Sequence, residues 1–356
     1  MTLECLLIAD DLTGACDAAV QFALRGLRVK VSLDSSRVLE DTDVLSVSTE
    51  SRDAGVAAFQ QALARLPKLQ PRILFKKIDS TLRGNVGQEV AAALAAFDCD
   101  LAVVTPAFPA MGRTVDAGYL RVAGTADFSP LELAACFRDY GVGPYCHSLT
   151  AAGGVRFALL DATCDAHLDA IVAQGLALPQ RVLWAGSAGL AAALARALGA
   201  SATAPPVPPA GTPLFCLGSD HAVTLEQQDH LIHCRAATLL SAEEVAPEAV
   251  LGALRRGPVV LRIRRGHTSA GRVRELLADV ANPLALSGGD TASLVCGALG
   301  VRAIELRQEV APGIPCGSLV GGPFDQLPVV TKSGGFGGPD ALMQVADFFT
   351  CSQSLH

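Results

Sequence analysis

The sequence predicts an α/β fold of two domains, each built on a mostly parallel sheet, with the active site in the cleft between them. The first observation is that short apolar runs alternate with amphipathic stretches along the chain, which is typical of strands joined by crossover helices. The second is that half of the 356 residues are hydrophobic but only 5% are aromatic, and small aliphatic residues suit parallel strands covered by helices. The third is a proline-rich break that divides the chain.

That break covers residues 201–213, which read SATAPPVPPAGTP. Proline lacks a backbone donor and stiffens the chain, so the alanine-rich helix that precedes the break cannot continue through it. We therefore expect an N-terminal domain at residues 1–200 and a C-terminal domain at residues 214–356, joined by a linker that acts as a closing hinge.

The predicted N-terminal domain opens with an apolar strand at residues 6–9 and an amphipathic helix at residues 13–25, which Gly26 ends because glycine readily adopts positive φ. Further strands are expected at residues 29–33, 44–48, 73–77, 101–105, 157–160 and 182–185. Helical patterns lie between several of them, at residues 56–65, 88–97, 167–174 and 190–198. This alternation predicts right-handed crossovers and a mostly parallel sheet.

The same alternation resumes after the linker, with no internal repeat of fixed period. Strands are expected at residues 214–217, 259–263, 284–287, 303–306 and 329–332. Helices are expected at residues 224–233, 271–280, 291–299 and 339–349. The C-terminal part is therefore a second α/β domain.

Charge and cysteine usage exclude several classes of protein. The net charge of −7 argues against a nucleic-acid partner or an anionic membrane surface, and no apolar run reaches the ~18–20 residues of a membrane span. Residues 1–9 carry no basic region typical of a signal peptide. The eleven cysteines form no Cys-x-x-Cys pair, which favours free thiols in a reducing cytoplasm over disulfides or zinc. No histidine spacing indicates a metal site either, so we expect a cytoplasmic protein with no resident metal.

Polar residues follow several predicted strands of the N-terminal domain, at the end of the sheet where open α/β proteins bind ligands. The loops contain carboxylates, hydroxyls and four cations, and they cover residues 10–14, 48–52, 76–85 and 105–114, with Arg52, Lys77, Arg83 and Arg113. Such a mixture suits a small polyhydroxy acid, because arginine binds its carboxylate while Asp, Ser and Thr bind its hydroxyls.

Structural explanations exist for some of these residues. Asp10, Asp11 or Thr13 could simply cap the first helix, and the Lys76–Lys77 pair could be a solvated strand end. Against the second explanation, the chain has only five lysines, and three of them (Lys76, Lys77 and Lys332) lie in candidate site loops.

The C-terminal domain has three glycine-bearing turns after predicted strands, at residues 217–220, 287–292 and 331–338. Glycine lets the backbone approach a phosphate, and the amides at a helix start then point toward the anion. A single turn of this kind is weak evidence, but three in one domain favour a phosphate site. Neither a Walker A motif nor the G-x-G-x-x-G fingerprint of dinucleotide-binding proteins is present.

These motifs resemble the four-carbon acid sugar kinase family, which includes threonate, erythronate and 3-oxo-tetronate kinases. The resemblance spans nearly the whole chain and rests on ADDLTGA at residues 9–15, KIDSTLRGN at 77–85, PAFP at 106–109 with Gly112-Arg113, GGDT at 288–291 and KSGGFG at 332–337. The chain departs from the family at His221, where a further serine is usual.

The resemblance implies that the N-terminal domain binds the acid sugar and the C-terminal domain binds ATP. Carried over by motif, the acid would contact Asp11, Arg52, Lys77, Asp79, Ser80, Thr81, Leu82 and Arg83. The nucleotide would contact Ser219, Gly288, Gly289, Asp290, Thr291, Ser333 and Gly334.

The resulting hypothesis is an ATP-dependent kinase that phosphorylates a hydroxyl, expected to be the terminal one, of a four-carbon sugar acid. Asp11 or Asp79 would orient or deprotonate the attacking hydroxyl, and Lys332 would balance phosphate charge together with Mg²⁺ carried by the nucleotide. Two alternatives stay open, a non-catalytic sensor of acid sugars and an NAD(P)-dependent oxidoreductase. A homo-oligomer is possible, and the stereoisomer used is open.

Overall fold

A computed structural model describes residues 3–37, 39–124, 128–138, 143–151, 154–199 and 211–351. The chain divides into two compact units, the first made of residues 1–29 and 34–203 and the second of residues 30–33 and 204–356. The predicted linker lies outside the described residues except for its last three positions. Both units combine a mostly parallel sheet with helices, so the predicted fold class is confirmed.

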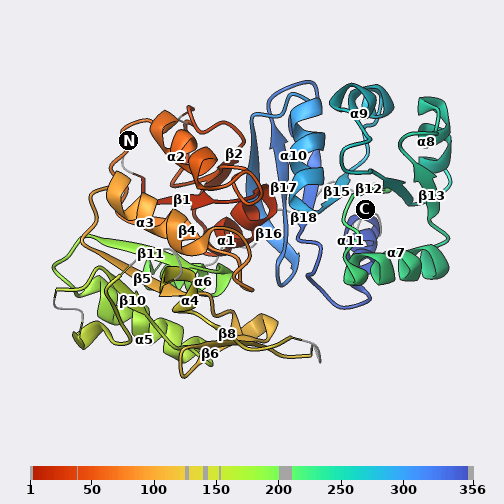
Figure 1. The fold of residues 1–356 in the computed structure, drawn as a ribbon. Helices are drawn as coiled ribbons and strands as arrows, with labels where there is room; N and C mark the ends of the chain where they lie inside the picture. The colour runs from red at the N-terminus through yellow and green to blue at the C-terminus, as the bar shows by residue number, and fades with distance from the viewer. Residues whose placement is uncertain are drawn as a thin grey trace. The chain divides into compact units, whose positions relative to one another are not determined.

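The first unit is a parallel sheet with helices on both faces (Figure 1). Its strand order is β3-β1-β4-β11-β5-β10-β9, with β1 (Cys5–Ala9), β3 (Val44–Ser48), β4 (Ile73–Lys77), β5 (Leu101–Thr105), β9 (Tyr145–Cys146), β10 (Phe157–Leu159) and β11 (Val182–Gly186). The strands β1, β3 and β4 are buried along their whole length, including the two serines of β3 and the two lysines that end β4.

Two groups of helices cover this sheet. One group is α1 (Leu12–Ala23), α5 (Asp165–Leu176) and α6 (Ala188–Ala197), in which α6 packs against both α1 and α5. The other is α2 (Val56–Arg65), α3 (Val86–Ala96) and α4 (Ala135–Arg138). Alanine-rich α1 is buried on nearly every side, because α6 and strand β3 both pack on it.

A small antiparallel sheet of β6 (Arg113–Asp116), β7 (Tyr119–Val122) and β8 (Leu131–Glu132) was not predicted. Only Val115 of β6 and Leu120 of β7 are buried, so the sequence shows no apolar run there. Short pairing of this kind depends on the neighbouring strand rather than on local pattern.

The second unit has the strand order β13-β14-β12-β15-β18-β17-β16, with β2 next to β16. Pairing is parallel from β13 to β18 and antiparallel from β18 through β17 to β16. The bounds are β2 (Val29–Ser32), β12 (Leu214–Leu217), β13 (Thr238–Ser241), β14 (Val259–Arg262), β15 (Leu284–Ser287), β16 (Ala303–Ala311), β17 (Ile314–Val320) and β18 (Pro328–Lys332).

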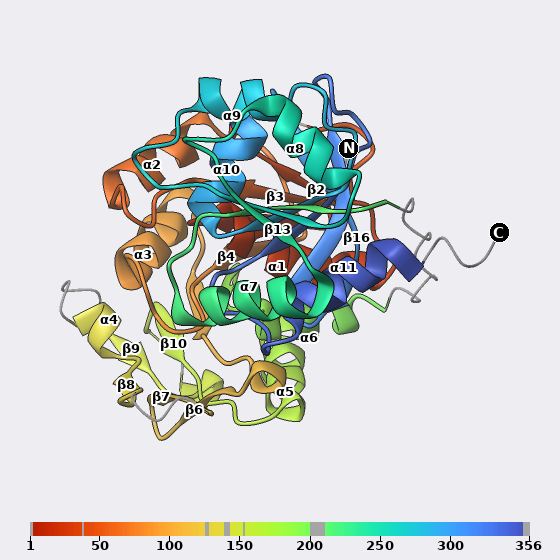
Figure 2. The same cartoon turned by 90° about the vertical axis from the view of Figure 1, so that its right-hand side faces the viewer.

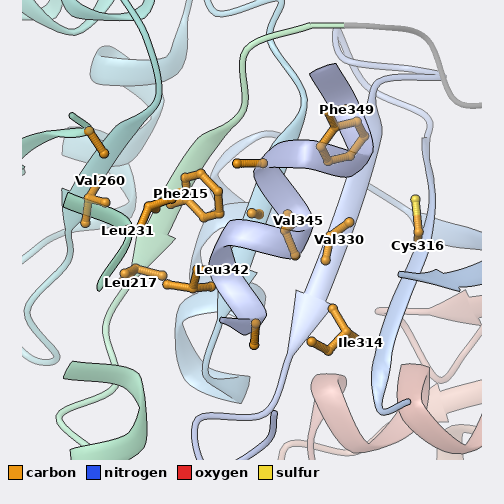
Figure 3. Packing of buried hydrophobic residues seen from close by; sticks show 14 residues of the cluster. Phe215, Leu217, Leu231, Val260, Ile314, Cys316, Val330, Leu342, Val345 and Phe349 are labelled. Carbon is orange, nitrogen blue, oxygen red and sulfur yellow. The ribbon is translucent and has the colours of Figure 1, made fainter. Parts of the chain in front are cut away.

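Figure 2 shows α8 (Pro247–Leu254), α9 (Ala270–Leu277) and α10 (Gly289–Ala298) on one side of these strands, and α7 (Ala222–Arg235) and α11 (Ala341–Cys351) on the other. A hydrophobic cluster fixes α11 to the sheet (Figure 3). In it Phe349 and Val345 of α11 pack with Phe215 of β12 and Val330 of β18, and all four side chains are buried.

Residues 30–33 belong to the second unit, although the sequence analysis placed them in the first domain. The backbone amide of Leu33 donates to the carbonyl of Arg302 at 3.2 Å, which ties the segment to the start of β16. A run of alternating Val and polar residues predicts a strand but not the sheet it joins, because that choice depends on the partner strand.

Most predicted elements lie within about two residues of the observed ones. In the first unit α4 and β9 were not predicted, in addition to the small antiparallel sheet. In the second unit β13, α8 and β17 were not predicted, and β16 continues to Ala311 instead of ending at residue 306. The extension exists because β16 and β17 form an antiparallel hairpin whose turn contains Gly313 at a φ of 75°. Ten cysteines of the described part form no disulfide bond. None of the helices in the described ranges has the length and apolar character of a membrane span.

Candidate functional site

The candidate acid site lies where β3, β1 and β4 end side by side. Because these three strands are parallel neighbours, the loops that follow them meet at one edge of the sheet. They bring together Asp10 and Asp11 after β1, Arg52 after β3 and Asp79 after β4. The three carboxylates are at most 6% exposed.

Arg52 is the centre of this cluster. Its Nε and Nη2 donate to the two oxygens of Asp10 at 2.8 and 2.9 Å, and its Nη1 donates to Asp11 Oδ2 at 2.5 Å. Nη2 also lies 3.6 Å from Asp79 Oδ2. Burial alone would lower the pKa of Arg52, but the charges of Asp11 and Asp10 outweigh it and raise that pKa. Arg52 therefore stays charged and organises the anionic edge.

The turn after β4 is organised by Asp79. Its Oδ1 accepts from the backbone amide and hydroxyl of Thr81 at 2.9 and 2.5 Å, and Arg83 binds both oxygens at 3.2 and 2.7 Å. Burial would raise the pKa of Asp79, but the charges of Arg83 and Arg52 hold it well below its usual range. Leu82 lies at a φ of 62°, and the turn keeps the half-exposed Arg83 at the edge of the site.

Asp11 also caps helix α1. Its Oδ1 accepts from the backbone amide of Gly14 at 2.7 Å, and its Oδ2 accepts from the Thr13 hydroxyl at 3.1 Å. The capping explanation and the site explanation therefore both apply to one carboxylate. Burial raises the pKa of Asp11 in spite of the neighbouring Arg52 charge. A Cβ at Gly14 would lie 2.5 Å from Asp11 Oδ1 and 3.4 Å from Lys77 Nζ, so glycine is needed for this close packing.

The adjacent lysines Lys76 and Lys77 face opposite sides of the sheet, as successive strand residues must. Lys76 Nζ pairs with Glu89 Oε2 of α3 at 2.8 Å and lies 5.0 Å from the ring centre of Phe59 of α2. Both partners of that ion pair are almost fully buried, and Ser51 donates to the other Glu89 oxygen at 2.6 Å. Lys76 is therefore part of the structure that supports the site.

Lys77 is on the side of the sheet that α1 covers, together with the candidate acid-binding residues. Its Nζ donates to the carbonyl of Ile78 at 3.0 Å, and its charge acts on Asp10, Asp11, Asp17 and Asp79. It is 3% exposed. Among the described residues no carboxylate lies within ion-pair distance of this ammonium, which leaves it able to bind an anion.

Asp17 was missed by the sequence analysis. It lies in α1, three residues after Gly14 and therefore on the helix face that packs against Lys77, and it is 2% exposed. Its Oδ1 is buried without a hydrogen-bond partner in the described structure. Burial raises its pKa to about 6. The feature that could have revealed it is that Asp17 is the one charged residue of α1.

In the second unit, the three glycine-bearing turns converge on Ser219. A Cβ at Gly334 would lie 2.3 Å from Ser219 Oγ, and one at Gly288 would lie 3.6 Å from Ser219 Cβ. A Cβ at Gly218 would lie 2.1 Å from Thr291 Oγ1. These close approaches unite the loops after β12, β15 and β18, and Gly288, at a φ of 101°, precedes the first residue of α10, Gly289.

His221 caps the helix that follows this turn, as a serine could. Its ring Nδ1 accepts from the backbone amide of Val223 at 3.2 Å and so caps helix α7. The amide of His221 itself donates to Ser219 Oγ at 3.2 Å. The departure from the family pattern therefore leaves the turn well formed.

Lys332 is buried below the loop that follows β18. Its Nζ donates to the carbonyls of Ser333, Gly334 and Phe336 at 3.0 to 3.2 Å, which uses the three donors of an ammonium group. Burial lowers the pKa of Lys332 to about 7. Gln227 of α7 donates to the next carbonyls of the same loop. This geometry favours a role for Lys332 in shaping the loop over direct contact with phosphate.

Asp290 lies apart from the buried centre of these loops. Its side chain is 56% exposed and pairs with the exposed Arg265 at 3.0 Å. Thr291, the next residue of α10, is 6% exposed and points toward Gly218. Of the two, Thr291 is the better-placed residue to support the glycine turns.

Comparisons with known proteins agree with the division of the chain into an N-terminal and a C-terminal part. A model of a sugar-binding N-terminal domain matches residues 5–139, and a model of a nucleotide-binding C-terminal domain matches residues 260–342. The D-threonate kinase of Bordetella bronchiseptica is 33% identical, with 96% of each chain covered. The D-threonate kinase of Salmonella typhimurium is 31% identical, with coverage of 96% of this chain and 97% of that one. A 3-oxo-tetronate kinase of Methylobacterium radiotolerans is 30% identical, with coverage of 98% and 99%.

Solved structures share the fold. One from Salmonella typhimurium has a TM-score of 0.73 at 22% identity, covering 96% of this chain and 98% of that one. Another, from Haemophilus influenzae, has a TM-score of 0.71 at 23% identity, covering 98% and 99%. The fold is therefore found over the full length of both neighbours.

Proposed function

Because this chain belongs to the four-carbon acid sugar kinase family, we propose that it is an ATP-dependent kinase that phosphorylates a hydroxyl, the terminal one, of a four-carbon sugar acid. The observation that carries the proposal is the presence on one chain of two different polar sites. One is an edge of carboxylates and cations centred on Arg52, and the other is a set of glycine turns centred on Ser219.

The edge around Arg52 is suited to a hydroxy acid. Lys77 is a buried ammonium with one backbone acceptor, and the half-exposed Arg83 can share its donors with a ligand, so both can bind a substrate carboxylate. Ser80 and Thr81 and the backbone of Leu82 border the same turn and can bind hydroxyls. Asp11 and Asp79, each already held by arginine, would orient the acid.

The glycine turns are suited to the phosphates of ATP. Gly288, Gly289 and Thr291 at the start of α10 and Ser219 before α7 can present amides and hydroxyls to an anion. Ser333 and Gly334 belong to the loop that Lys332 holds in shape. Mg²⁺ bound by the nucleotide would neutralise phosphate charge. Asp290 and Ser219, in the same loops, have side-chain oxygens that could coordinate this ion.

The test is ADP formation by the purified full-length protein with ATP and Mg²⁺ across D-threonate, L-threonate, D-erythronate, L-erythronate and the 3-oxo-tetronates. We expect rapid ADP formation with at least one acid and little with glycerate or a five-carbon acid. Binding of an acid by calorimetry without ADP formation would support the sensor alternative. Oxidation or reduction of an acid with NAD(P) would support the oxidoreductase.

A further inference from the structure

Asp17 is a buried carboxylate for which the mechanism above has no use. The other acidic groups of the edge are fully engaged: both oxygens of Asp10 accept from Arg52, and Asp79 is bound by Arg83 and Thr81. Asp11 accepts from Gly14 with one oxygen and from Arg52 and Thr13 with the other. A carboxylate with its lone pairs taken by donors is a poor proton acceptor.

Asp17 differs in that its Oδ1 is buried and accepts no hydrogen bond in the described structure. It is held inside the same cluster, because the helix turn that carries it packs Gly14 against Lys77 and Asp11. A side chain at this helix position leans back toward the first turn, and therefore toward Gly14 and the ligand edge. The chain thus keeps an unsatisfied acceptor within the field of the Lys77 ammonium, an arrangement that is costly unless a ligand uses it.

We propose that Asp17 is the catalytic base of this kinase, and that it accepts the proton of the substrate hydroxyl that attacks ATP. The inference rests on the proposed function. In the step, the hydroxyl oxygen forms a bond to the γ-phosphorus while its proton passes to Asp17 Oδ1. The bond between that phosphorus and the β–γ bridging oxygen breaks, and ADP leaves with the electron pair. The products are the phosphorylated acid, ADP and one proton, which Asp17 releases to solvent.

The charges around Asp17 agree with this role. The groups that act on it are Lys77 on β4, Asp79 after β4, Asp11 at the start of α1 and Arg113 on β6. Strands β1 and β3 present no charged side chain to α1, and Arg196 of α6 is paired with Asp169. Burial raises the pKa of Asp17 to about 6, so the group is ionised at neutral pH but is basic enough to take a proton.

The main test replaces Asp17 by its uncharged isostere. Asp17→Asn should lower kcat by ~10²–10⁴-fold while the KM values for acid and ATP change by less than about threefold. The wild-type kcat should fall below about pH 6 with a slope of one, and the variant should lack that limb. Asp169→Asn, which removes a surface carboxylate from α5, should leave kcat and its pH profile unchanged. An active Asp17→Asn, or one whose defect is entirely in acid binding, would overturn the proposal.

A second measurement does not depend on activity. The folded-state pKa is raised above the ordinary 3.8, so the folded protein holds an extra proton between these two values and loses stability as the pH rises toward about 6. Asp17→Asn has no such loss. Its melting temperature should exceed that of the wild type above about pH 6, and the difference should shrink toward about pH 4.

These two readouts separate the possible failures. A wild type that forms no ADP with any acid contradicts the proposed kinase activity. If the melting temperature of Asp17→Asn shows no pH-dependent gain over the wild type, Asp17 is not an unsatisfied carboxylate. That result also contradicts its assignment as the base. If Asp17→Asn does not fold, the test uses Asp17→Glu and the pH dependence of the wild-type kcat. A Glu variant with unchanged kcat at unchanged KM would overturn the proposal. A wild-type kcat that does not change between about pH 5 and 7 would also overturn it.

Discussion

Neighbouring side chains at the edge of the first sheet have different tasks. Asp11 caps a helix and binds Arg52 with the same carboxylate, whereas Asp10 only binds Arg52. Lys77 is the cation with most capacity left for a ligand, since its Nζ has one backbone acceptor and no carboxylate within ion-pair distance in the described ranges. At this scale, function depends on which donors and acceptors remain unused.

The first prediction concerns Lys77. Lys77→Met keeps the length of the side chain but removes the charge, so acid affinity should fall by ~10–100-fold, because a hydrogen bond to a charged group contributes about 1.5–3 kcal/mol. ATP affinity should be unchanged. Calorimetric titration of the acid into the variant checks this, with Lys68→Met as the control because Lys68 is exposed. A folded Lys77→Met that binds acid as the wild type does would remove Lys77 from the site.

At the scale of elements, the site is supported by an ion pair between β4 and α3. Lys76 and Glu89 are both almost fully buried, 2.8 Å apart, and Ser51 and Phe59 complete their surroundings. Breaking one side of a buried pair leaves an uncompensated charge, which costs about 3–5 kcal/mol. The ion pair therefore fixes α3 to β4 beneath the ligand edge.

The second prediction follows from this pair. Lys76→Met should lower the free energy of unfolding of the first unit by about 3–5 kcal/mol, and adding Glu89→Gln should restore part of the loss because the unpaired charge is removed. The single tryptophan, Trp184, is buried in β11, so its fluorescence during urea unfolding reports on this unit. Lys68→Met serves again as the control. Equal stabilities of Lys76→Met and wild type would show that the pair contributes nothing net.

The third prediction compares two glycines of the loop after β18. At Gly334 a Cβ would lie 2.3 Å from Ser219 Oγ, whereas at Gly338 it would meet nothing within 4 Å, and neither has a positive φ. Gly334→Ala must displace Ser219, so ATP affinity should fall about tenfold or more, in line with the ~1–3 kcal/mol cost of overpacking. Gly338→Ala should bind ATP normally. Calorimetry with a non-hydrolysable analogue makes the comparison, and equal affinities would place the phosphates elsewhere.

At the scale of the whole molecule, the chain consists of two compact units, each of which contains one of the two candidate sites. The first unit contains the Arg52 edge, and the second contains the Ser219 turns and the cluster around Phe349. A ligand that binds only the folded form of one unit stabilises that unit by mass action.

The fourth prediction uses hydrogen exchange to locate each ligand. Threonate, or the acid that supports turnover, should slow exchange in residues 10–17, 50–55 and 78–85. A non-hydrolysable ATP analogue should slow it in residues 218–224, 288–292 and 333–338. Mass spectrometry of peptides from the full chain measures both. Protection of the second unit by the acid alone, with none in the first, would reverse the assignment.

The sequence by itself determined the α/β class, most strands and helices, and the loops that carry polar groups. These features are local: a stretch such as VLSVS at residues 44–48 or the amphipathic stretch at residues 56–65 carries the periodicity of its own element. The motifs in the loops also determined the family. The elements and the motifs could be predicted because both are properties of short segments: the periodicity of a strand or helix, and the residue types of a turn.

Only the tertiary structure decided how these pieces are used. It assigned residues 30–33 to the second unit, turned Lys76 toward Glu89 and Lys77 toward the ligand edge, and surrounded Lys332 with three carbonyls. It also left Asp17 buried with an unused oxygen. The physical reason is that the partner of a strand, a buried charge or an unpaired acceptor comes from segments far away along the chain, and no local pattern specifies which segment that is.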